Sequence, residues 1–276
     1  LGTHEFTLGG DYYTRIYGGG ELVLTGDETY KGKVTDKTSG ISLYGDGAKF
    51  TMKNVDYKAA KTGGRGVFID KRYSSALIDI ENSTMVGKYF CVNTNATTEV
   101  GSNNTITLSN STFTADETAL LVNIPVTVTA TQCTFTGGWQ GVFLRGGTST
   151  FDGCTFNLAV NSQYDKNTVE AGAITWTEGN QAPSAAITAG NRSKSAYDYK
   201  TTFELKNSCV FSVKVDDTDS QDYPAIYIDA EKNKPNQGVV FKYSSDTFGS
   251  VGTGLDIRET TGKVTVNGTE YKGKVD

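Results

Sequence analysis

The sequence is poor in the residues that mark disulfide frameworks, metal sites and histidine catalysis. It contains 4 Cys and 1 His among 276 residues, with no CxxC pair and no Cys/His spacing typical of zinc. The only histidine, His4, lies far along the chain from every cysteine, which argues against cysteine–histidine catalysis. An apolar run of roughly 18 residues, the length that a membrane helix needs, is also missing, so we expect no membrane insertion.

Positive charge is in short supply as well. The chain has 26 Lys and Arg against 31 Asp and Glu, giving a formal net charge of -5. A nucleic-acid partner requires a basic surface that neutralises phosphates, so we expect none. Leu1 does not open a charged-then-apolar signal peptide, and we expect that it follows a removed leader or a boundary.

Glycine and short alternating segments are abundant, and together they form a repeat. The 32 Gly favour tight turns between short strands. Apolar and polar residues alternate and then end on Asn at 50–54, 78–82, 106–110 and 203–207. A second short strand follows the Asn, and a third follows after a variable loop, at 66–70, 89–93, 119–123, 141–145, 173–177, 225–229 and 254–258.

These seven coils predict an all-β fold, a right-handed parallel β-helix with three sheets and capped ends. Asn suits the corner because it tolerates left-handed backbone, and its amide can bond the Asn stacked above it. We expect one structural domain, with an irregular first coil and cap at 1–40, coils at 41–262, and a closing hairpin at 263–276 around Asn267 and Gly268.

With these Asn corners and three-strand coils, residues 41–262 resemble the pectin-lyase-like right-handed parallel β-helix superfamily. The resemblance implies that the sheet of third strands, flanked by loops, forms a polysaccharide groove. It also implies, for the lyases, calcium held by clustered carboxylates beside an Arg or Lys base. The hydrolases of the superfamily use close Asp residues and a Gly-His-Gly motif, which this sequence lacks.

The cysteines are expected at two kinds of position. Cys133, Cys154 and Cys209 should share one inward column directly after the corner, as unbridged buried thiols. Cys91 is expected to point outward from a third strand.

The outward side of the third strands is the candidate binding surface. Its middle and last positions form two expected columns, one largely apolar and one polar, and Trp139 is expected at its rim or packed in a turn. Rings can stack on sugar C–H groups while amides and charged groups bond hydroxyls, although such rings also stack simply to stabilise a sheet. The candidate glycan-binding residues are Phe68, Asp70, Asn93, Asn123, Phe143, Arg145, Tyr227, Asp229, Asp256 and Arg258.

The pattern favours a secreted or bacterial cell-surface protein that binds a polysaccharide or glycan in the manner of an adhesin, without a catalytic cluster. The alternative is a polysaccharide lyase or epimerase acting on an acidic glycan, since Asp229 and Asp256 near Arg258 are compatible with a calcium site beside a base. A surface ion-pair ladder explains the same three residues more simply, and no other cofactor is expected. A structural spacer is the third reading.

Overall fold

We describe the fold from a computed structural model. It describes residues 5–70, 72–95, 99–159, 184–190, 199–214, 223–229, 238–244, 255–257, 264–266 and 268–271. Every regular element in these ranges is a β-strand, as the composition predicts. Across the same ranges, no helix has the length and hydrophobicity needed to cross a membrane.

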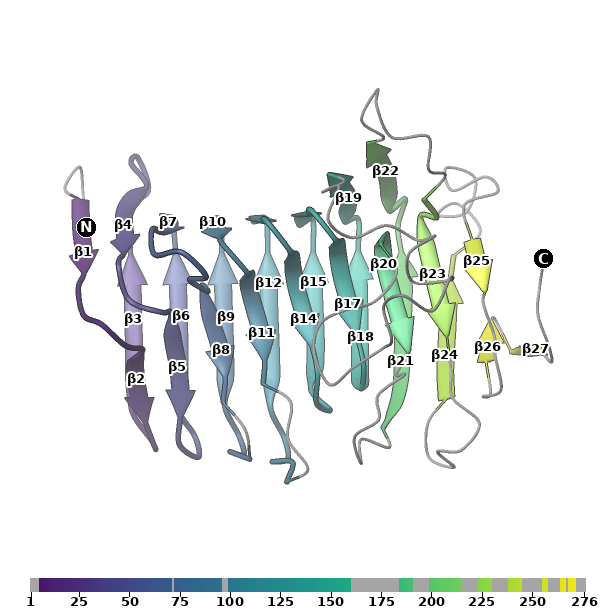
Figure 1. The fold of residues 1–276 in the computed structure, drawn as a ribbon, viewed down its shortest axis with the longest axis horizontal. Helices are drawn as coiled ribbons and strands as arrows, with labels where there is room; N and C mark the ends of the chain where they lie inside the picture. Colours follow the sequence, from purple (N-terminus) through teal and green to yellow (C-terminus); the bar gives the residue numbers. More distant parts are fainter. Residues whose placement is uncertain are drawn as a thin grey trace.

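The strands cycle through three sheets, which we call A, B and C (Figure 1). Sheet A has eight strands: β1 (Glu5–Leu8), β4 (Gly32–Asp36), β7 (Val55–Ala59), β10 (Thr84–Gly87), β13 (Thr112–Ala115), β16 (Thr134–Gly137), β19 (Thr155–Ala159) and β22 (Val210–Lys214). Sheet B has nine: β2 (Thr14–Tyr17), β5 (Ile41–Tyr44), β8 (Val67–Ile69), β11 (Phe90–Thr94), β14 (Thr118–Val122), β17 (Gln140–Leu144), β20 (Ala185–Gly190), β23 (Ile226–Asp229) and β25 (Leu255–Ile257).

Sheet C completes each coil and has ten strands: β3 (Glu21–Thr25), β6 (Lys49–Lys53), β9 (Leu77–Glu81), β12 (Thr105–Ser109), β15 (Thr127–Thr131), β18 (Gly147–Asp152), β21 (Lys200–Lys206), β24 (Gly238–Tyr243), β26 (Val264–Val266) and β27 (Thr269–Tyr271). Neighbouring strands pair in parallel, each with the strand one coil away, except at β26–β27. The predicted three-sheet parallel β-helix is therefore confirmed.

The two ends of the stack differ. Instead of an irregular coil, residues 5–36 supply β1 to β4, which pair in parallel with the next coil in the same way as later strands. At the other end β26 and β27 pair antiparallel, with Val264 opposite Tyr271. Gly268, between these two strands, has a φ of 85°, the left-handed conformation that favours glycine.

One predicted strand was assigned to the wrong segment. The member of sheet B between β17 and β23 is Ala185–Gly190, not 173–177, which lies outside the described residues. Both segments carry an Ala-Ile-Thr sequence, at 173–175 and 186–188, so their patterns are alike. Pairing of Val142 with Ile187 fixes the correct register.

The core is a narrow apolar column between the sheets. Aromatic rings stack from coil to coil along its axis, with 5.3 Å between the ring centroids of Phe113 and Phe135 and 5.8 Å between those of Phe135 and Phe156. Because each coil adds its own inward residues, the core lengthens with the stack and contacts remain between neighbours.

The corner between sheets C and A is left-handed, as predicted, but its hydrogen bonds come from the next residue. Asn54, Asn82, Asn110 and Asn207 have φ between 47° and 54°. Asn110 is exposed, and across the described corners no Asn amide bonds another, so the predicted amide ladder is wrong. The backbone amide of Asn82, not its side chain, continues the stack by donating to the Ser109 carbonyl at 3.1 Å.

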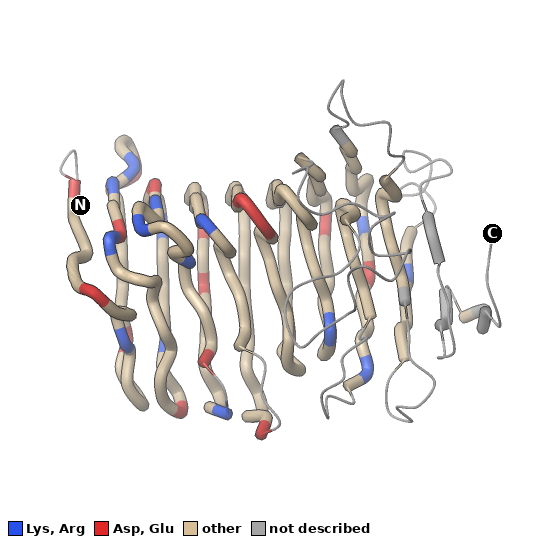
Figure 2. Tube along the Cα trace, in the orientation of Figure 1, with Lys and Arg blue, Asp and Glu red and all other residues tan. Residues whose placement is uncertain are grey.

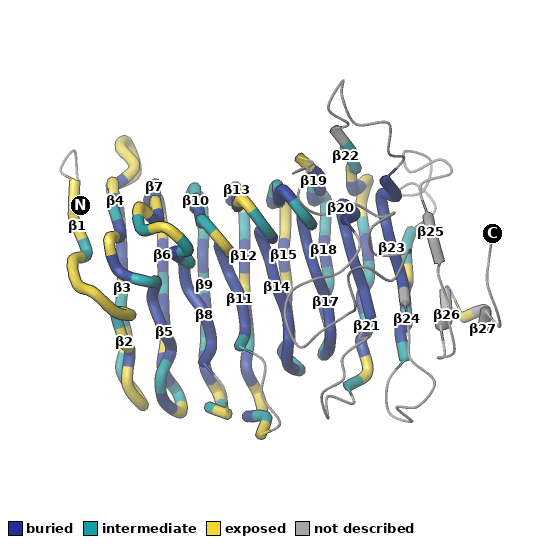
Figure 3. Tube along the Cα trace, viewed as in Figure 1, coloured by how far each residue is buried: buried dark blue, intermediate teal, exposed yellow. Residues whose placement is uncertain are grey.

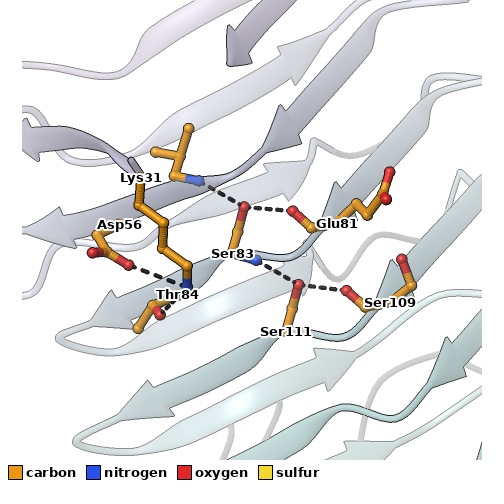
Figure 4. A network of polar contacts seen from close by, with 8 residues as sticks. Lys31, Asp56, Glu81, Ser83, Thr84, Ser109 and Ser111 are labelled. Atoms are coloured by element: carbon orange, nitrogen blue, oxygen red, sulfur yellow. Dashed lines mark hydrogen bonds and ion pairs between the residues drawn. The ribbon is translucent and has the colours of Figure 1, made fainter. Parts of the chain in front are cut away.

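Buried hydroxyl groups form the ladder instead (Figure 4). Ser83 Oγ accepts from the Val55 amide at 3.1 Å and donates to the Glu81 carbonyl at 2.7 Å. One coil on, Ser111 Oγ accepts from the Ser83 amide at 3.0 Å and donates to the Ser109 carbonyl at 2.7 Å.

The predicted cysteine column continues this hydroxyl ladder. Cys133, Cys154 and Cys209 are buried and unbridged, which confirms both expectations. The sulfur of Cys133 lies 3.4 Å from the Thr131 carbonyl, the same contact within the coil that the serines make. The residue after the corner is thus a serine or cysteine whose side chain donates a hydrogen bond to the backbone carbonyl two residues earlier.

Candidate glycan-binding face

The register of sheet B decides which outward residues stand beside one another. Parallel pairing aligns Phe68 with Asn93, then Asn93 with Leu121 and Leu121 with Phe143. Asn93 therefore shares the column of Phe68 rather than that of Asp70, which corrects the predicted alignment. The whole column is Arg15, Ser42, Phe68, Asn93, Leu121, Phe143, Thr188, Tyr227 and Asp256.

The predicted alignment of β11 was offset by two residues, because it placed Cys91 rather than Asn93 beside Phe68 and Leu121. The Cys91 side chain is fully buried in the core, and so is that of the next residue, Val92. Two consecutive inward residues interrupt the strict alternation of a strand, so Cys91 points inward although Asn93, two residues further on, points outward. The expected outward thiol is wrong, and burial raises the Cys91 pKa to about 12.

In the middle of sheet B the outward rings are buried rather than exposed. Phe143 is 0% exposed and Tyr227 is 4% exposed. They belong to a second apolar cluster with Phe90, Leu121 and Ala185, against which Trp139 packs. Figure 3 shows this burial as dark blue along β14 and β17. The rings face away from the central core as predicted, but neighbouring side chains cover them.

Arg145 and Asn123 belong to this covered region. Arg145 is 2% exposed, donates from a guanidinium nitrogen to Asn123 Oδ1 at 3.0 Å, and lies over the Phe143 ring at 4.2 Å. Asn123 in turn donates from Nδ2 to the Thr94 carbonyl at 3.0 Å. These contacts give both residues a packing role within the sheet.

Around Phe68 the surroundings are polar. The Tyr13 ring meets the Phe68 ring edge-on with centroids 5.0 Å apart, and the Arg65 guanidinium lies 5.3 Å from the Phe68 centroid. Tyr13 is 38% exposed while Phe68 is 1% exposed. Among the described residues, the half-open Tyr13 ring and the Arg65 guanidinium therefore lie against Phe68.

A hydrogen-bonded chain runs beside Phe68. Arg65 donates to Asn95 Oδ1 at 2.8 Å, and Asn95 Nδ2 donates to Asp70 Oδ1 at 2.9 Å. Asn93 Nδ2 lies 3.4 Å from Asn95 Oδ1. The structure thus brings together the predicted residues Phe68, Asp70 and Asn93 and adds Arg65 and Asn95.

Exposed and half-buried tyrosines continue this surface toward the N-terminus. We call Arg15, Tyr17, Tyr44 and Tyr73 the tyrosine face. Its ring centroids are 5.9 Å apart for Tyr17 and Tyr44 and 5.2 Å apart for Tyr44 and Tyr73. Arg15 lies 4.6 Å from the Tyr44 centroid, and Tyr17 is 61% exposed.

Sequence reasoning missed the tyrosine face because residues 1–40 were assigned to an irregular cap. The available signal was the alternation of Thr14-Arg-Ile-Tyr17 followed by Ile41-Ser-Leu-Tyr44, which places Arg15 beside Ser42 and Tyr17 beside Tyr44.

One acidic group near Arg65 titrates unusually. Burial raises the pKa of the half-buried Glu117 to about 7; the Arg65 charge opposes this and Asp116 adds to it. Lys88 pairs with Asp116 at 3.3 Å. Figure 2 shows acidic and basic residues interspersed along the N-terminal coils.

Most of the predicted calcium site lies outside the part of the chain that the structure describes. The side chains of Asp229 and Asp256, and all of Arg258, lie outside the described residues. Backbone pairing aligns Asp256 with Tyr227, so Asp229 lies two residues further along its strand. Among the side chains that the structure describes, no group of three or more His, Cys, Asp or Glu is placed to hold a metal ion.

Comparisons with family models, curated proteins and solved structures find no match to this chain.

Proposed function

We propose that the chain is a noncatalytic glycan-binding β-helix of a secreted or cell-surface protein, acting like an adhesin, with a polysaccharide or glycan as its partner. The observation that carries this is the tyrosine face, a group of exposed and half-buried rings with one guanidinium beside the Asp70–Asn95 pair. Exposed rings offer faces for sugar C–H groups, and amide and carboxylate groups bond hydroxyls. A relationship to the pectin-lyase-like superfamily would place a polysaccharide on the same sheet.

Binding of the purified chain to a glycan array, followed by calorimetry on a bound glycan, tests this. Tyr17→Ala and Tyr44→Ala should each weaken binding by about 1–2 kcal/mol. Tyr30→Ala is the matched control, because Tyr30 is 57% exposed but lies between β3 and β4, away from sheet B. Equal affinities in all variants, or no bound glycan, would reject the proposal.

A polysaccharide lyase or epimerase acting on an acidic glycan is the second candidate. It is favoured by Glu117, whose pKa of about 7 beside Arg65 suits a general base near neutral pH. Incubation with polygalacturonate and alginate, with and without calcium, followed by unsaturated-uronate absorbance and product analysis for epimerisation, separates the two. Turnover that is lost in Glu117→Gln would establish the enzyme, and unchanged substrate supports a binding module.

A further inference from the structure

Two buried polar atoms flank Phe68 on the outer side of sheet B. Ser42 and Asn93 pair with Phe68 from the neighbouring strands β5 and β11. Both are 1% exposed, and neither Ser42 Oγ nor Asn93 Oδ1 has a hydrogen-bond partner in the part of the chain that the structure describes. Most buried polar groups in proteins are hydrogen-bonded, so two such atoms around one ring point to a ligand.

The network fixes which kind of hydrogen bond is missing at Asn93. Arg65 can only donate and the Asp70 carboxylate can only accept, so Asn95 must present Oδ1 to Arg65 and Nδ2 to Asp70. Asn93 must then turn its Nδ2 toward Asn95 Oδ1. Its free atom is therefore an acceptor, and a ligand there must supply a donor.

Charge around the ring argues against an anionic ligand. Asp70 adds a second acceptor, of which Asn95 engages one oxygen. Arg65 is the cation over the ring, and it is already bonded to Asn95 and lies near Glu117. A carboxylate or sulfate would face the Asp70 carboxylate, and the cation that the structure describes over the ring is already bonded to Asn95.

Tyr13 covers the ring from an exposed segment. Lys61 holds this segment by donating to the Asp11 carbonyl and to Ser39 Oγ, the latter at 3.1 Å. The Tyr13 and Phe68 rings form a T-shaped pair with centroids 5.0 Å apart, so a sugar that approaches Phe68 from this side must displace the Tyr13 ring.

We propose that Ser42, Phe68, Asp70 and Asn93 form a closed subsite for a sugar ring that presents hydroxyl or amino donors and no acidic group, and that the sugar enters by displacing the Tyr13 ring. We call these four residues the Phe68 subsite. It deepens the glycan-binding function and rests on it. Adjacent strands are about 4.8 Å apart, so Ser42 and Asn93 lie on either side of Phe68, within reach of a sugar that contacts its ring.

Binding to mannan, β-glucan, xylan, chitosan and polygalacturonate tests the ligand class. The intact chain should bind at least one neutral or amino polymer more tightly than polygalacturonate. Tightest binding to polygalacturonate would overturn the assignment of the Phe68 subsite.

Variants test the residues against the polymer that binds best. Asn93→Leu removes the acceptor at nearly constant size, and it should weaken binding about 10-fold without lowering the melting temperature. Ser42→Ala should also weaken binding, and it serves as the second variant if Asn93→Leu folds poorly. Tyr13→Ala should tighten binding about 5-fold by opening the site, whereas the control Tyr12→Ala, at a side chain 79% exposed, should not.

The outcomes separate the subsite from the general function. If Tyr17→Ala weakens binding but the substitutions at Ser42, Asn93 and Tyr13 leave it unchanged, glycan binding stands and the Phe68 subsite is wrong. If the intact chain binds a glycan of the array but no neutral or amino polymer of the panel, the Phe68 subsite is wrong and glycan binding stands. If it binds neither, both proposals fail.

Discussion

Phe68 and Phe143 occupy the same outward column of sheet B, on β8 and β17, yet their surroundings differ. Phe143 packs in an apolar cluster with Leu121 and Tyr227. Phe68 lies between polar Ser42 and Asn93, under a half-open tyrosine. The register sets the direction in which a side chain points. The residues beside that side chain then determine whether it packs in a second apolar cluster or lies at a candidate binding surface.

The largest expected effect separates these two phenylalanines by stability. Phe143→Ala should cost about 4 kcal/mol, because it leaves a cavity in a packed cluster. Phe68→Ala should cost about 2 kcal/mol, since the Tyr13 ring can settle into part of the space. Chemical denaturation of both variants measures the difference, and equal losses would show that the two regions are packed alike.

A smaller effect is expected at the serine ladder, which lies away from both regions. Ser111→Ala should cost about 1–2 kcal/mol, because the Ser83 amide loses its acceptor. Ser111→Cys is the control and should cost less, since cysteine fills the equivalent position at Cys133. If Ser111→Ala is as stable as the intact chain, the serine ladder does not stabilise the fold.

The corner residue before that serine should matter less still. Asn110→Ala should cost about 1 kcal/mol, because alanine disfavours the left-handed backbone at a φ of 47°. Asn110→Gly should change stability little, since Gly153 takes a left-handed φ of 59° just before Cys154, as Asn110 does before Ser111. Similar melting temperatures for the Ala and Gly variants would contradict a backbone origin.

The smallest expected effect is a dependence of the stability on pH, which arises from Glu117. Burial raises the pKa of Glu117 to about 7 in the folded chain. The Glu117 carboxyl group therefore binds its proton more tightly in the folded chain than in the unfolded chain. The stability contributed by protonated Glu117 is present at pH 4 and declines as pH rises to about 7. Glu117→Gln should therefore raise the melting temperature more at pH 8 than at pH 5, and an equal change at both would refute the shift.

More of the fold than of the candidate site could be predicted from the sequence. Alternation and recurring Asn corners predict the coils because each coil repeats the same inward pattern. The site depended on register, and a two-residue offset in the predicted alignment of β11 put Asn93 in the wrong column. Burial of Phe143 could not be predicted from its own strand, because it arises from Trp139 and from residues on other coils.

Hydrogen–deuterium exchange with and without a bound glycan tests most directly whether the N-terminal part of sheet B is the binding face. The account predicts added protection in β2, β5 and β8 and in the segment around Tyr13, with little change in β14 and β17. Protection centred on β14 and β17, or spread evenly over the three sheets, would contradict it.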